Sequence, residues 1–131
     1  LRQLQNLYTD SLTGLPNRNM MTFQINKQLA ALHRQQAGMA LLFIDLDNFK
    51  KVNDSHGHHF GDEVVKLAGE RLSRVIREND LIARFGGDEF VILVENIGET
   101  LAKSKKIAEL ISNKIIREIS AQVVIAQINI G

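Results

Sequence analysis

The spacing of apolar residues changes several times along the chain, and each change marks the start of a new element. Four short segments are rich in apolar residues and are bounded by glycine or by polar residues, which predicts buried β-strands. Two of these segments are separated only by two glycines and two acids, so they are expected to form a hairpin. The four predicted strands are Met39 to Asp45, Leu81 to Phe85, Phe90 to Val94 and Val123 to Ile130.

Longer segments repeat their apolar residues at helical spacing. They predict helices from about Asn19 to Gln36, Gly61 to Arg77 and Thr100 to Ile119, with a short polar helical turn from Asn48 to Asp54. The elements therefore follow one another as helix, strand, helix, hairpin, helix and strand. That order indicates an α+β fold in which helices pack against a mainly antiparallel sheet.

The two ends of the chain carry separate expectations. Apolar residues recur at helical spacing in residues 1–9, which are expected to be the end of an N-terminal linker helix. A frayed leader explains so short a stretch equally well. Residues 10–18 collect the only proline with Gly, Asn and Asp, which predicts a loop that ends in a helix N-cap. The main domain is assigned to residues 10–131, and it is expected to be truncated because the sequence stops at Gly131, directly after a strand.

Composition limits the classes of protein to which the chain can belong. Hydrophobic residues make up 44% and charged residues 24% of the 131 residues, which is the profile of one globular domain. Sixteen basic residues nearly cancel fifteen acidic ones, so the charge indicates neither a nucleic-acid partner nor direct membrane contact by this domain. The absence of cysteine excludes disulfides and thiolate zinc sites and fits a cytoplasmic location. No apolar run reaches the roughly 20 residues of a membrane helix, although the parent protein could still be membrane-anchored.

Acidic residues gather at two points where divalent-metal chemistry could occur. Asp45 and Asp47 end an apolar strand, and the two-residue period of a strand would place both carboxylates on one face, as hard oxygen ligands for Mg²⁺. They fit a cap of the next helical turn equally well. Asp88 and Glu89 lie in the predicted hairpin, which taken alone is an ordinary turn. A strand-end Asp and an acidic hairpin in one small sheet are nevertheless the layout of a metal-assisted phosphoryl-transfer site.

Three histidines lie close together in the sequence, at His56, His58 and His59. Their spacing does not match the helical spacing of zinc ligands, and no cysteine assists them. A polar contact with a ligand, or packing of the loop, is the favoured interpretation.

Three sequence blocks resemble the GGDEF domain family of diguanylate cyclases. Residues 10–18 read DSLTGLPNR, residues 43–62 contain FIDLDNFKKVND and GHHFGD, and residues 84–90 read RFGGDEF. The blocks occur in the family's order and spacing, and the compatible pattern covers essentially the whole chain. The resemblance implies a fold similar to polymerase palms and class III nucleotidyl cyclases. It also implies a reaction that joins two GTP molecules into cyclic di-GMP with release of two pyrophosphates.

The resemblance assigns the catalytic and metal-binding roles to individual residues. Asp45 would bind Mg²⁺ or Mn²⁺ through its carboxylate, and Leu46 would do so through its backbone carbonyl. Asp88 would bind metal and act as, or beside, the base for the attacking 3'-hydroxyl. Glu89 would complete the acidic turn, and Lys50 would contact a phosphate or the transition state.

The resemblance also implies residues that bind substrate and product. Asn53 and Asp62 match the guanine-reading pair, and an amide with a carboxylate can together recognise guanine. His58 matches a further substrate contact. Arg77 and Asp80 match the family's product-inhibition site, although Arg-x-x-Asp is also a common pattern at helix ends. Since each protomer would hold one GTP, the active form is expected to be a homodimer.

Two departures from the family pattern keep other functions open. The family usually shows Ser-Ile-Gly where residues 129–131 read Asn-Ile-Gly, and the later basic residues that bind phosphate in the family are not visible here. The first hypothesis is a diguanylate cyclase. The alternative is a catalytically silent regulatory module that binds GTP or cyclic di-GMP beside a phosphodiesterase domain. A polymerase-palm fragment acting on nucleic acid is disfavoured by the balanced charge.

Overall fold

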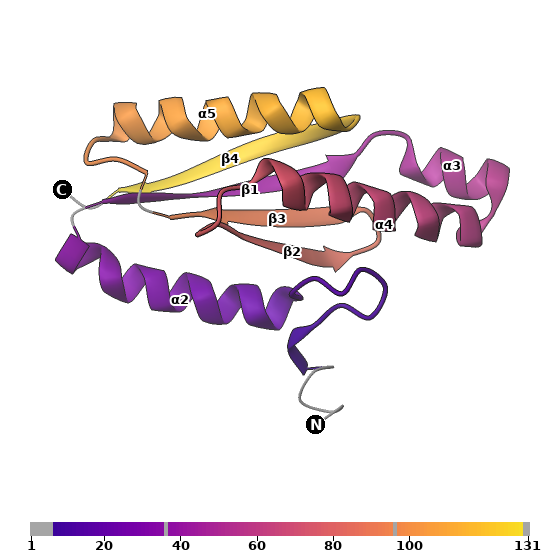
Figure 1. Cartoon of the computed structure of the whole chain (residues 1–131), viewed down its shortest axis with the longest axis horizontal. Helices are drawn as coiled ribbons and strands as arrows, with labels where there is room; N and C mark the ends of the chain where they lie inside the picture. The colour runs from indigo at the N-terminus through magenta and orange to yellow at the C-terminus, as the bar shows by residue number, and fades with distance from the viewer. Residues whose placement is uncertain (1–6, 36, 96, 130–131) are drawn as a thin grey trace.

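A four-stranded antiparallel sheet forms the centre of the molecule, with strand order β2-β3-β1-β4 (Figure 1). The computed structural model describes residues 7–35, 37–95 and 97–129. The strands are β1 (Gly38–Leu46), β2 (Leu81–Gly86), β3 (Glu89–Val94) and β4 (Ala121–Asn129). The helices are α2 (Arg18–Gln35), α3 (Phe49–His56), α4 (His58–Val75) and α5 (Leu101–Glu118). The predicted α+β architecture, an antiparallel palm-like sheet flanked by helices, is confirmed.

Each face of the sheet carries its own apolar cluster, because successive side chains of a strand point to opposite faces. Phe90, Ile92 and Val94 of β3 belong to the cluster that includes apolar residues of α4 and α5. Val91 and Leu93 of the same strand belong to the cluster that includes residues of α2. The two clusters therefore place α4 and α5 on one face of the sheet and α2 on the other. In Figure 1, α5 lies above β4, α4 passes in front of the strands and α2 lies below β2.

β1 lies between β3 and β4, so it is hydrogen-bonded to a neighbouring strand on both sides. Its register pairs Leu42 with Ile92 of β3 and with Ile125 of β4. Met39, Ala40 and Leu42 are fully buried as a result. The apolar run that predicted this strand therefore reflects its central place, where both faces of the strand are covered along most of its length.

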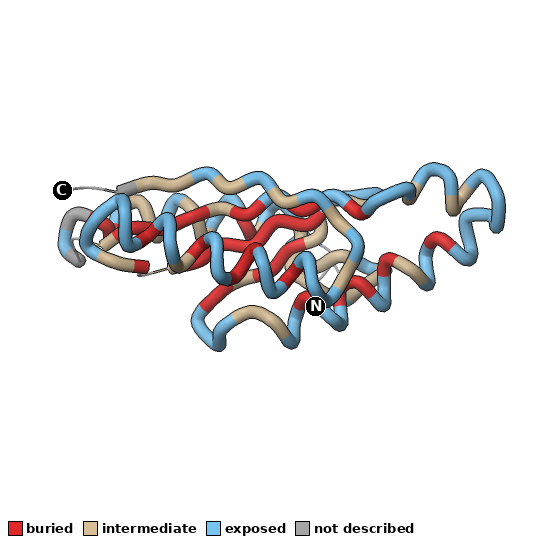
Figure 2. The backbone as a smooth tube through the Cα atoms, turned by 90° about the horizontal axis from the view of Figure 1, so that it is seen from above, coloured by how far each residue is buried: buried red, intermediate tan, exposed pale blue. Residues whose placement is uncertain are grey.

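The segment after β1 extends away from the sheet. Figure 2 shows buried positions along the strands and on the helix faces toward them, whereas α3 and the start of α4 are mostly exposed. None of the residues of α3, all of which are described, is buried. Asn48, the N-cap residue directly before α3, has a left-handed conformation, with φ 58°. Gly57, with φ 87°, separates α3 from α4, so a single residue connects two helices that were predicted to end at Asp54 and to begin at Gly61.

The N-terminal loop is the predicted one, and it ends in the predicted cap. Asn17 caps α2, because its Oδ1 accepts a hydrogen bond from the Met20 N–H at 3.1 Å. Thr9 pairs with Pro16 across the loop. Most of the expected linker helix in residues 1–9 lies outside the described residues.

The boundaries of α4 differ from the prediction at both ends. The helix begins at His58, before the predicted Gly61, and it ends at Val75, before the predicted Arg77. At the C-terminal end the Asp80 carboxylate accepts from the Arg77 N–H at 2.9 Å, which stabilises a turn in place of another helical residue. The predicted end of the last strand, Ile130, lies outside the described residues. Within the described ranges, no helix has the length and apolar character needed to cross a membrane.

Candidate functional site

The end of β1 and the β2–β3 turn lie side by side at one edge of the sheet. Asp45 is opposite Glu89 in the antiparallel register of β1 and β3. The Leu46 N–H donates to the Asp88 carbonyl at 3.3 Å. Gly86 has φ 141° and Gly87 has φ 47°, so the turn uses backbone conformations that favour glycine. The expected meeting of a strand-end acid with an acidic hairpin is therefore present.

The carboxyl groups at this edge repel one another unless a proton or a cation lies between them. Burial, a hydrogen bond with the Asp45 carboxyl, and the negative charges of Asp45 and Glu89 raise the pKa of Asp88 to about 6. A hydrogen bond between two carboxyl groups requires that one of them is protonated. The site thus favours a positive charge next to Asp88 at neutral pH.

A hard divalent cation fits this donor set. The Asp45 and Asp88 carboxylates are oxygen ligands of the kind that Mg²⁺ and Mn²⁺ prefer, and Leu46, with its backbone carbonyl, directly follows Asp45 in the chain. Among the described residues, no group of three or more His, Cys, Asp or Glu side chains is arranged so that it could hold a metal ion. Mg²⁺ commonly binds through one or two carboxylates and completes its shell with water and substrate phosphates. The donor set therefore suits a cation that arrives with a phosphate ligand.

The structure corrects the predicted pairing of Asp45 with Asp47. Asp47 follows the end of β1, where its Oδ2 accepts from the Ser120 hydroxyl at 2.9 Å and its N–H donates to the Ser120 carbonyl at 3.0 Å. The two-residue period applies only within a strand, and β1 ends at Leu46. The carboxyl group that contacts Asp45 is therefore that of Asp88, which lies in the turn between β2 and β3.

The face of the sheet next to these acids is partly open. A hollow of about 380 Å³ is lined by Asp45 and Glu89 and by apolar side chains that include Phe43, Phe85 and Val124. Phe43 is 42% exposed and Val124 is 65% exposed. The hollow lies in the size range of small-molecule sites, and its lining combines apolar side chains with the carboxyl groups of Asp45 and Glu89.

The predicted substrate-binding residues lie on α3 and α4. Lys50 and Asn53 are on α3, whereas His58 and Asp62 are on α4, and all except Asn53 are exposed. Asn53 is partly buried, and its Oδ1 has no hydrogen-bond partner among the described residues. A Cβ atom added at Gly61 would overlap this oxygen, so the glycine makes room for the amide directly beside Asp62. An acceptor without a protein partner is available for a donor from a ligand.

The histidines are not brought together as a metal site. His56 packs against Phe60, with ring centroids 5.0 Å apart. His58 and His59 are exposed in the first turn of α4. The packing of His56 is one of the two interpretations favoured from the sequence, whereas a polar contact with a ligand stays a prediction.

The predicted product-binding pair forms a closed ion pair. Arg77 Nε contacts both Asp80 carboxylate oxygens, at 3.2 and 3.1 Å, and Arg77 Nη2 contacts Oδ1 at 2.9 Å. The Asp80 side chain is 0% exposed, whereas that of Arg77 is 43% exposed. Arg77 also donates to the Glu95 carbonyl at 2.7 Å, while burial and the Asp80 charge raise the pKa of Glu95. The pair holds the chain before β2 in place.

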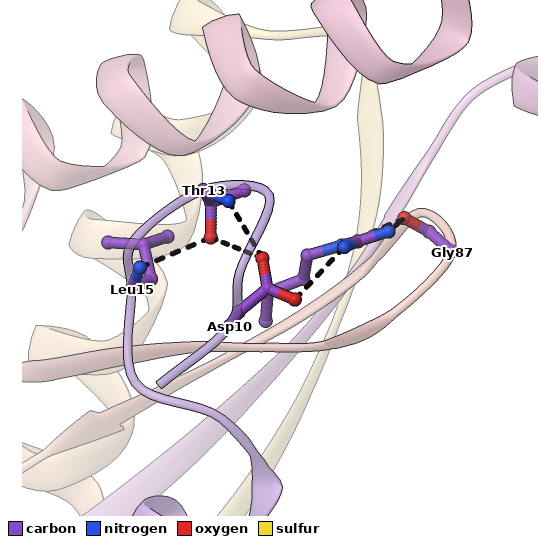
Figure 3. A network of polar contacts seen from close by, with 5 residues as sticks. Asp10, Thr13, Leu15 and Gly87 are labelled. Carbon is purple, nitrogen blue, oxygen red and sulfur yellow. Dashed lines mark hydrogen bonds and ion pairs between the residues drawn. The ribbon is translucent and has the colours of Figure 1, made fainter. Parts of the chain in front are cut away.

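Sequence reasoning missed one residue that contacts the acidic turn. Arg84 donates to the Gly87 carbonyl and to the Asp10 carboxylate, and Thr13 donates to the same carboxylate (Figure 3). The local signal was visible, because Asp followed three residues later by Thr favours a side-chain-stabilised turn. The partner of Asp10 lies 74 residues away in the sequence, which no local pattern identifies.

Comparison with known proteins adds independent information. The family model described as "Diguanylate cyclase, GGDEF domain" matches residues 7–131. DgcP of Pseudomonas aeruginosa, named a diguanylate cyclase, is 44% identical over 92 residues, which cover 70% of this chain and 14% of that protein. NbdA of the same species, named a cyclic di-GMP phosphodiesterase, is 44% identical over 86 residues, which cover 66% of this chain and 11% of that protein. The chain thus spans only a small part of the length of these curated relatives.

A solved structure agrees with the fold. The GGDEF domain of TpbB (YfiN) from Pseudomonas aeruginosa superimposes with a TM-score of 0.79 at 35% sequence identity, over 92% of this chain and 74% of that chain. The family model covers most of the sequence. The same residues form the sheet with the strand order and the acidic turn described above. The chain belongs to the GGDEF domain family.

Proposed function

We propose that this domain is a diguanylate cyclase that condenses two GTP molecules into cyclic di-GMP and releases two pyrophosphates. The observation that carries the proposal is the contact between the Asp45 and Asp88 carboxyl groups, where the raised pKa of Asp88 reflects burial and a shortage of positive charge. Relatives such as DgcP are named diguanylate cyclases, which supports the same reaction. The domain would therefore act in cyclic di-GMP signalling.

The proposed reaction forms one phosphodiester bond at a time. The 3'-oxygen of one GTP bonds to the α-phosphorus of the other, the bond from that phosphorus to the β-phosphate oxygen breaks, and pyrophosphate leaves. Asp88 takes the hydroxyl proton, or orients the group that takes it, and Glu89 adds negative charge to the turn. A bound Mg²⁺ or Mn²⁺ ion, held by Asp45, the Leu46 carbonyl and Asp88, would neutralise charge on the phosphates. Catalysis is then mainly positioning and charge neutralisation.

The residues of α3 and α4 would bind the nucleotide. Asn53 and Asp62 are proposed to read the guanine edge, since the unpartnered Asn53 Oδ1 can accept from guanine while the Asp62 carboxylate accepts from its N1 and N2 groups. Lys50 would contact a phosphate and His58 a further part of the substrate. Both are exposed, as direct contacts with a bound nucleotide require.

Two protomers are needed because each site holds one GTP and the reaction joins two. A two-fold homodimer presents the same site from each copy, so the 3'-hydroxyl of each GTP can face the α-phosphate of the other. We propose that the parent protein is active in this form, with GTP as substrate and no nucleic-acid partner. Cyclic di-GMP would also act as an inhibitor at Arg77 and Asp80, provided that their ion pair opens to admit a guanine or a phosphate.

The direct test uses the full-length protein with GTP and Mg²⁺. Cyclic di-GMP and pyrophosphate should form in a ratio of one to two, and Asp88→Asn should remove both products. Glu70→Gln, an exposed substitution on α4, is the matched control and should leave turnover unchanged. A full-length protein that binds GTP and Mg²⁺ but makes no product contradicts the cyclase proposal.

A second candidate function is a silent regulatory module next to a phosphodiesterase domain. The similarity to NbdA, which is named a cyclic di-GMP phosphodiesterase, favours this candidate. Calorimetry separates the two proposals, because a silent module would bind GTP or cyclic di-GMP without turnover. The intact acids at positions 45, 88 and 89 favour the cyclase.

A further inference from the structure

Arg84 lies near the end of β2, two residues before Gly86 and Gly87. None of the roles proposed above involves this residue. Its guanidinium donates twice to the Gly87 carbonyl, from Nε at 3.2 Å and from Nη2 at 2.9 Å. Its Nη1 donates to Asp10 Oδ1 at 3.0 Å (Figure 3). The Arg84 and Asp10 side chains are only 13% and 15% exposed, so this ion pair is largely shielded from water.

The Gly87 carbonyl has a direct geometric link to Asp88. A peptide bond is planar, so the carbonyl of residue 87 and the N–H of residue 88 belong to one rigid unit. Fixing the Gly87 oxygen therefore fixes the peptide plane that leads into Asp88. The peptide plane on the other side is fixed by the Leu46 N–H, which donates to the Asp88 carbonyl at 3.3 Å. Asp88 is thus held from both sides, once by Arg84 and once by β1.

The turn needs such a contact because its own sequence does not restrict it. Gly86 and Gly87 have no Cβ atom, and glycine loses more conformational freedom on folding than any other residue. The register of β2 and β3 also shifts between Arg84 and Gly86, so the regular ladder is interrupted before the turn. The paired donors of a guanidinium hold a carbonyl in a defined direction, which a single point charge does less well.

Asp10 is itself held in a rigid loop. The Thr13 N–H and hydroxyl both donate to Asp10 Oδ2, at 2.8 and 2.7 Å. The Arg84 N–H donates to the Pro16 carbonyl at 3.0 Å, so the loop is joined to β2 through the backbone as well. The guanidinium therefore lies between an anchored carboxylate and the carbonyl that it orients.

We propose that Arg84 is a positioning residue for Asp88, with Asp10 as its anchor, and that the N-terminal loop thereby sets the geometry of the catalytic turn. The inference rests on the proposed cyclase function. Arg84 does not touch the reacting atoms, and its effect passes through the Gly87–Asp88 peptide. The link runs from residues 10–16 to the acidic edge of the sheet.

The kinetic test compares Arg84→Ala and Arg84→Lys in the full-length protein. Arg84→Ala should lower kcat by about 100-fold, the loss typical of a catalytic group displaced by about 1 Å. The KM for GTP should change by less than about threefold, because the nucleotide contacts are elsewhere. Arg84→Lys keeps the positive charge but lacks the paired N–H donors of the guanidinium, so it should recover only part of the lost kcat. The matched control is Arg71→Ala, which removes a guanidinium contact with the Glu118 carbonyl on α5 and should leave kcat unchanged.

A charge swap separates positioning from simple stabilisation. The double variant Asp10→Arg/Arg84→Asp restores opposite charges but places a carboxylate toward the Gly87 carbonyl, which it cannot hold. It should be more stable than the Arg84→Asp single variant and remain slow. Recovery of the wild-type kcat in the double variant overturns the proposal, and so does a kcat of Arg84→Lys and Arg84→Ala within about twofold of wild type.

Hydrogen exchange gives a readout that does not depend on turnover. The Leu46 amide, which donates to the Asp88 carbonyl, should exchange at least about tenfold faster in Arg84→Ala and measurably faster in Arg84→Lys, while amides at the centre of β1 stay protected. Unchanged exchange at Leu46 in both variants overturns the proposal. If the wild-type protein makes no cyclic di-GMP, the proposed function fails, yet the exchange rate of Leu46 still decides whether Arg84 holds the turn.

Discussion

Replacing Asp88 with Asn should make the metal-free protein more stable at pH 8 and weaken its stabilisation by Mg²⁺. Burial, the hydrogen bond with Asp45 and the charges of Asp45 and Glu89 raise the pKa of Asp88 from 3.8 to about 6. A raised pKa means that folding favours the protonated carboxyl. The contribution of Asp88 to the free energy of unfolding is therefore fully present below pH 4 and is lost as the pH rises through about 6.

The size of the effect follows from this shift. A change from 3.8 to about 6 is about 2 pKa units, which corresponds to about 3 kcal/mol between the two protonation states. Asp88 is only partly buried, and screening by solvent reduces the net penalty to about 1 kcal/mol. Asn has the same shape and does not titrate. The Asp88→Asn variant should therefore exceed the wild type by about 1 kcal/mol at pH 8 and match it near pH 4.

Urea unfolding in the presence of a chelator measures this difference at both pH values. Glu70→Gln, the exposed control on α4, should stay within about 0.5 kcal/mol of wild type throughout. If Asp88→Asn is less stable than wild type at pH 8 without metal, the proposed repulsion at the acidic edge is wrong.

Mg²⁺ provides the second half of the test. An ion that binds only the folded wild type should add about 2.7 kcal/mol to its stability when its concentration is 100 times the dissociation constant. The Asp88→Asn variant lacks one of the two carboxylates and should gain much less. An equal gain in both proteins would show that Mg²⁺ binds elsewhere.

Three further perturbations test other parts of the structure. Gly61→Ala would force Asn53 aside and should weaken GTP binding by about tenfold or more in calorimetry, since a lost hydrogen bond and a shifted helix both contribute; unchanged affinity would contradict the role of this amide. Burial raises the pKa of Asp10, but hydrogen bonds from Thr13 and the guanidinium of Arg84 outweigh it, so the pKa is lowered overall. The wild type should therefore be more stable than Asp10→Asn above pH 4, and this advantage should shrink as the pH falls further. Thermal unfolding at several pH values measures the difference. Arg77→Ala should destabilise the fold by about 3 kcal/mol in urea, because it leaves a buried carboxylate without its partner; a loss below about 0.5 kcal/mol would show that the ion pair has no structural role.

Local periodicity was sufficient to predict the elements of the fold. The apolar run in β1 and the glycines between β2 and β3 each act through residues that are adjacent in sequence. Strand alternation, helix caps and tight turns depend on such near neighbours. For the same reason the hairpin and a helix N-cap at the end of the N-terminal loop could be predicted, and the structure identifies Asn17 as that cap. The start of α4 could not be predicted, because both a loop and a helix are compatible with its histidines.

Side-chain partners across the sheet could not be predicted from local patterns. Asp45 pairs with Asp88 and not with Asp47, because the end of β1 releases the chain from the two-residue period. Arg84 reaches Asp10 across 74 residues of sequence. These contacts depend on which strands become neighbours and at which register, and a shift of one residue would turn each side chain to the other face.

The sequence by itself thus determined the class of fold and the order of its elements, because residue chemistry and short-range periodicity are properties of the chain. The residues that would bind a cation or a nucleotide stay predictions, most of them implied by the resemblance to the GGDEF family. Tertiary structure alone decided that Asp45 contacts Asp88, that Arg84 donates to the Gly87 carbonyl, and that Arg77 and Asp80 form an ion pair with each other. Those outcomes follow from the packing of distant segments, whose free energy is shared over the whole core and is not encoded in any one motif.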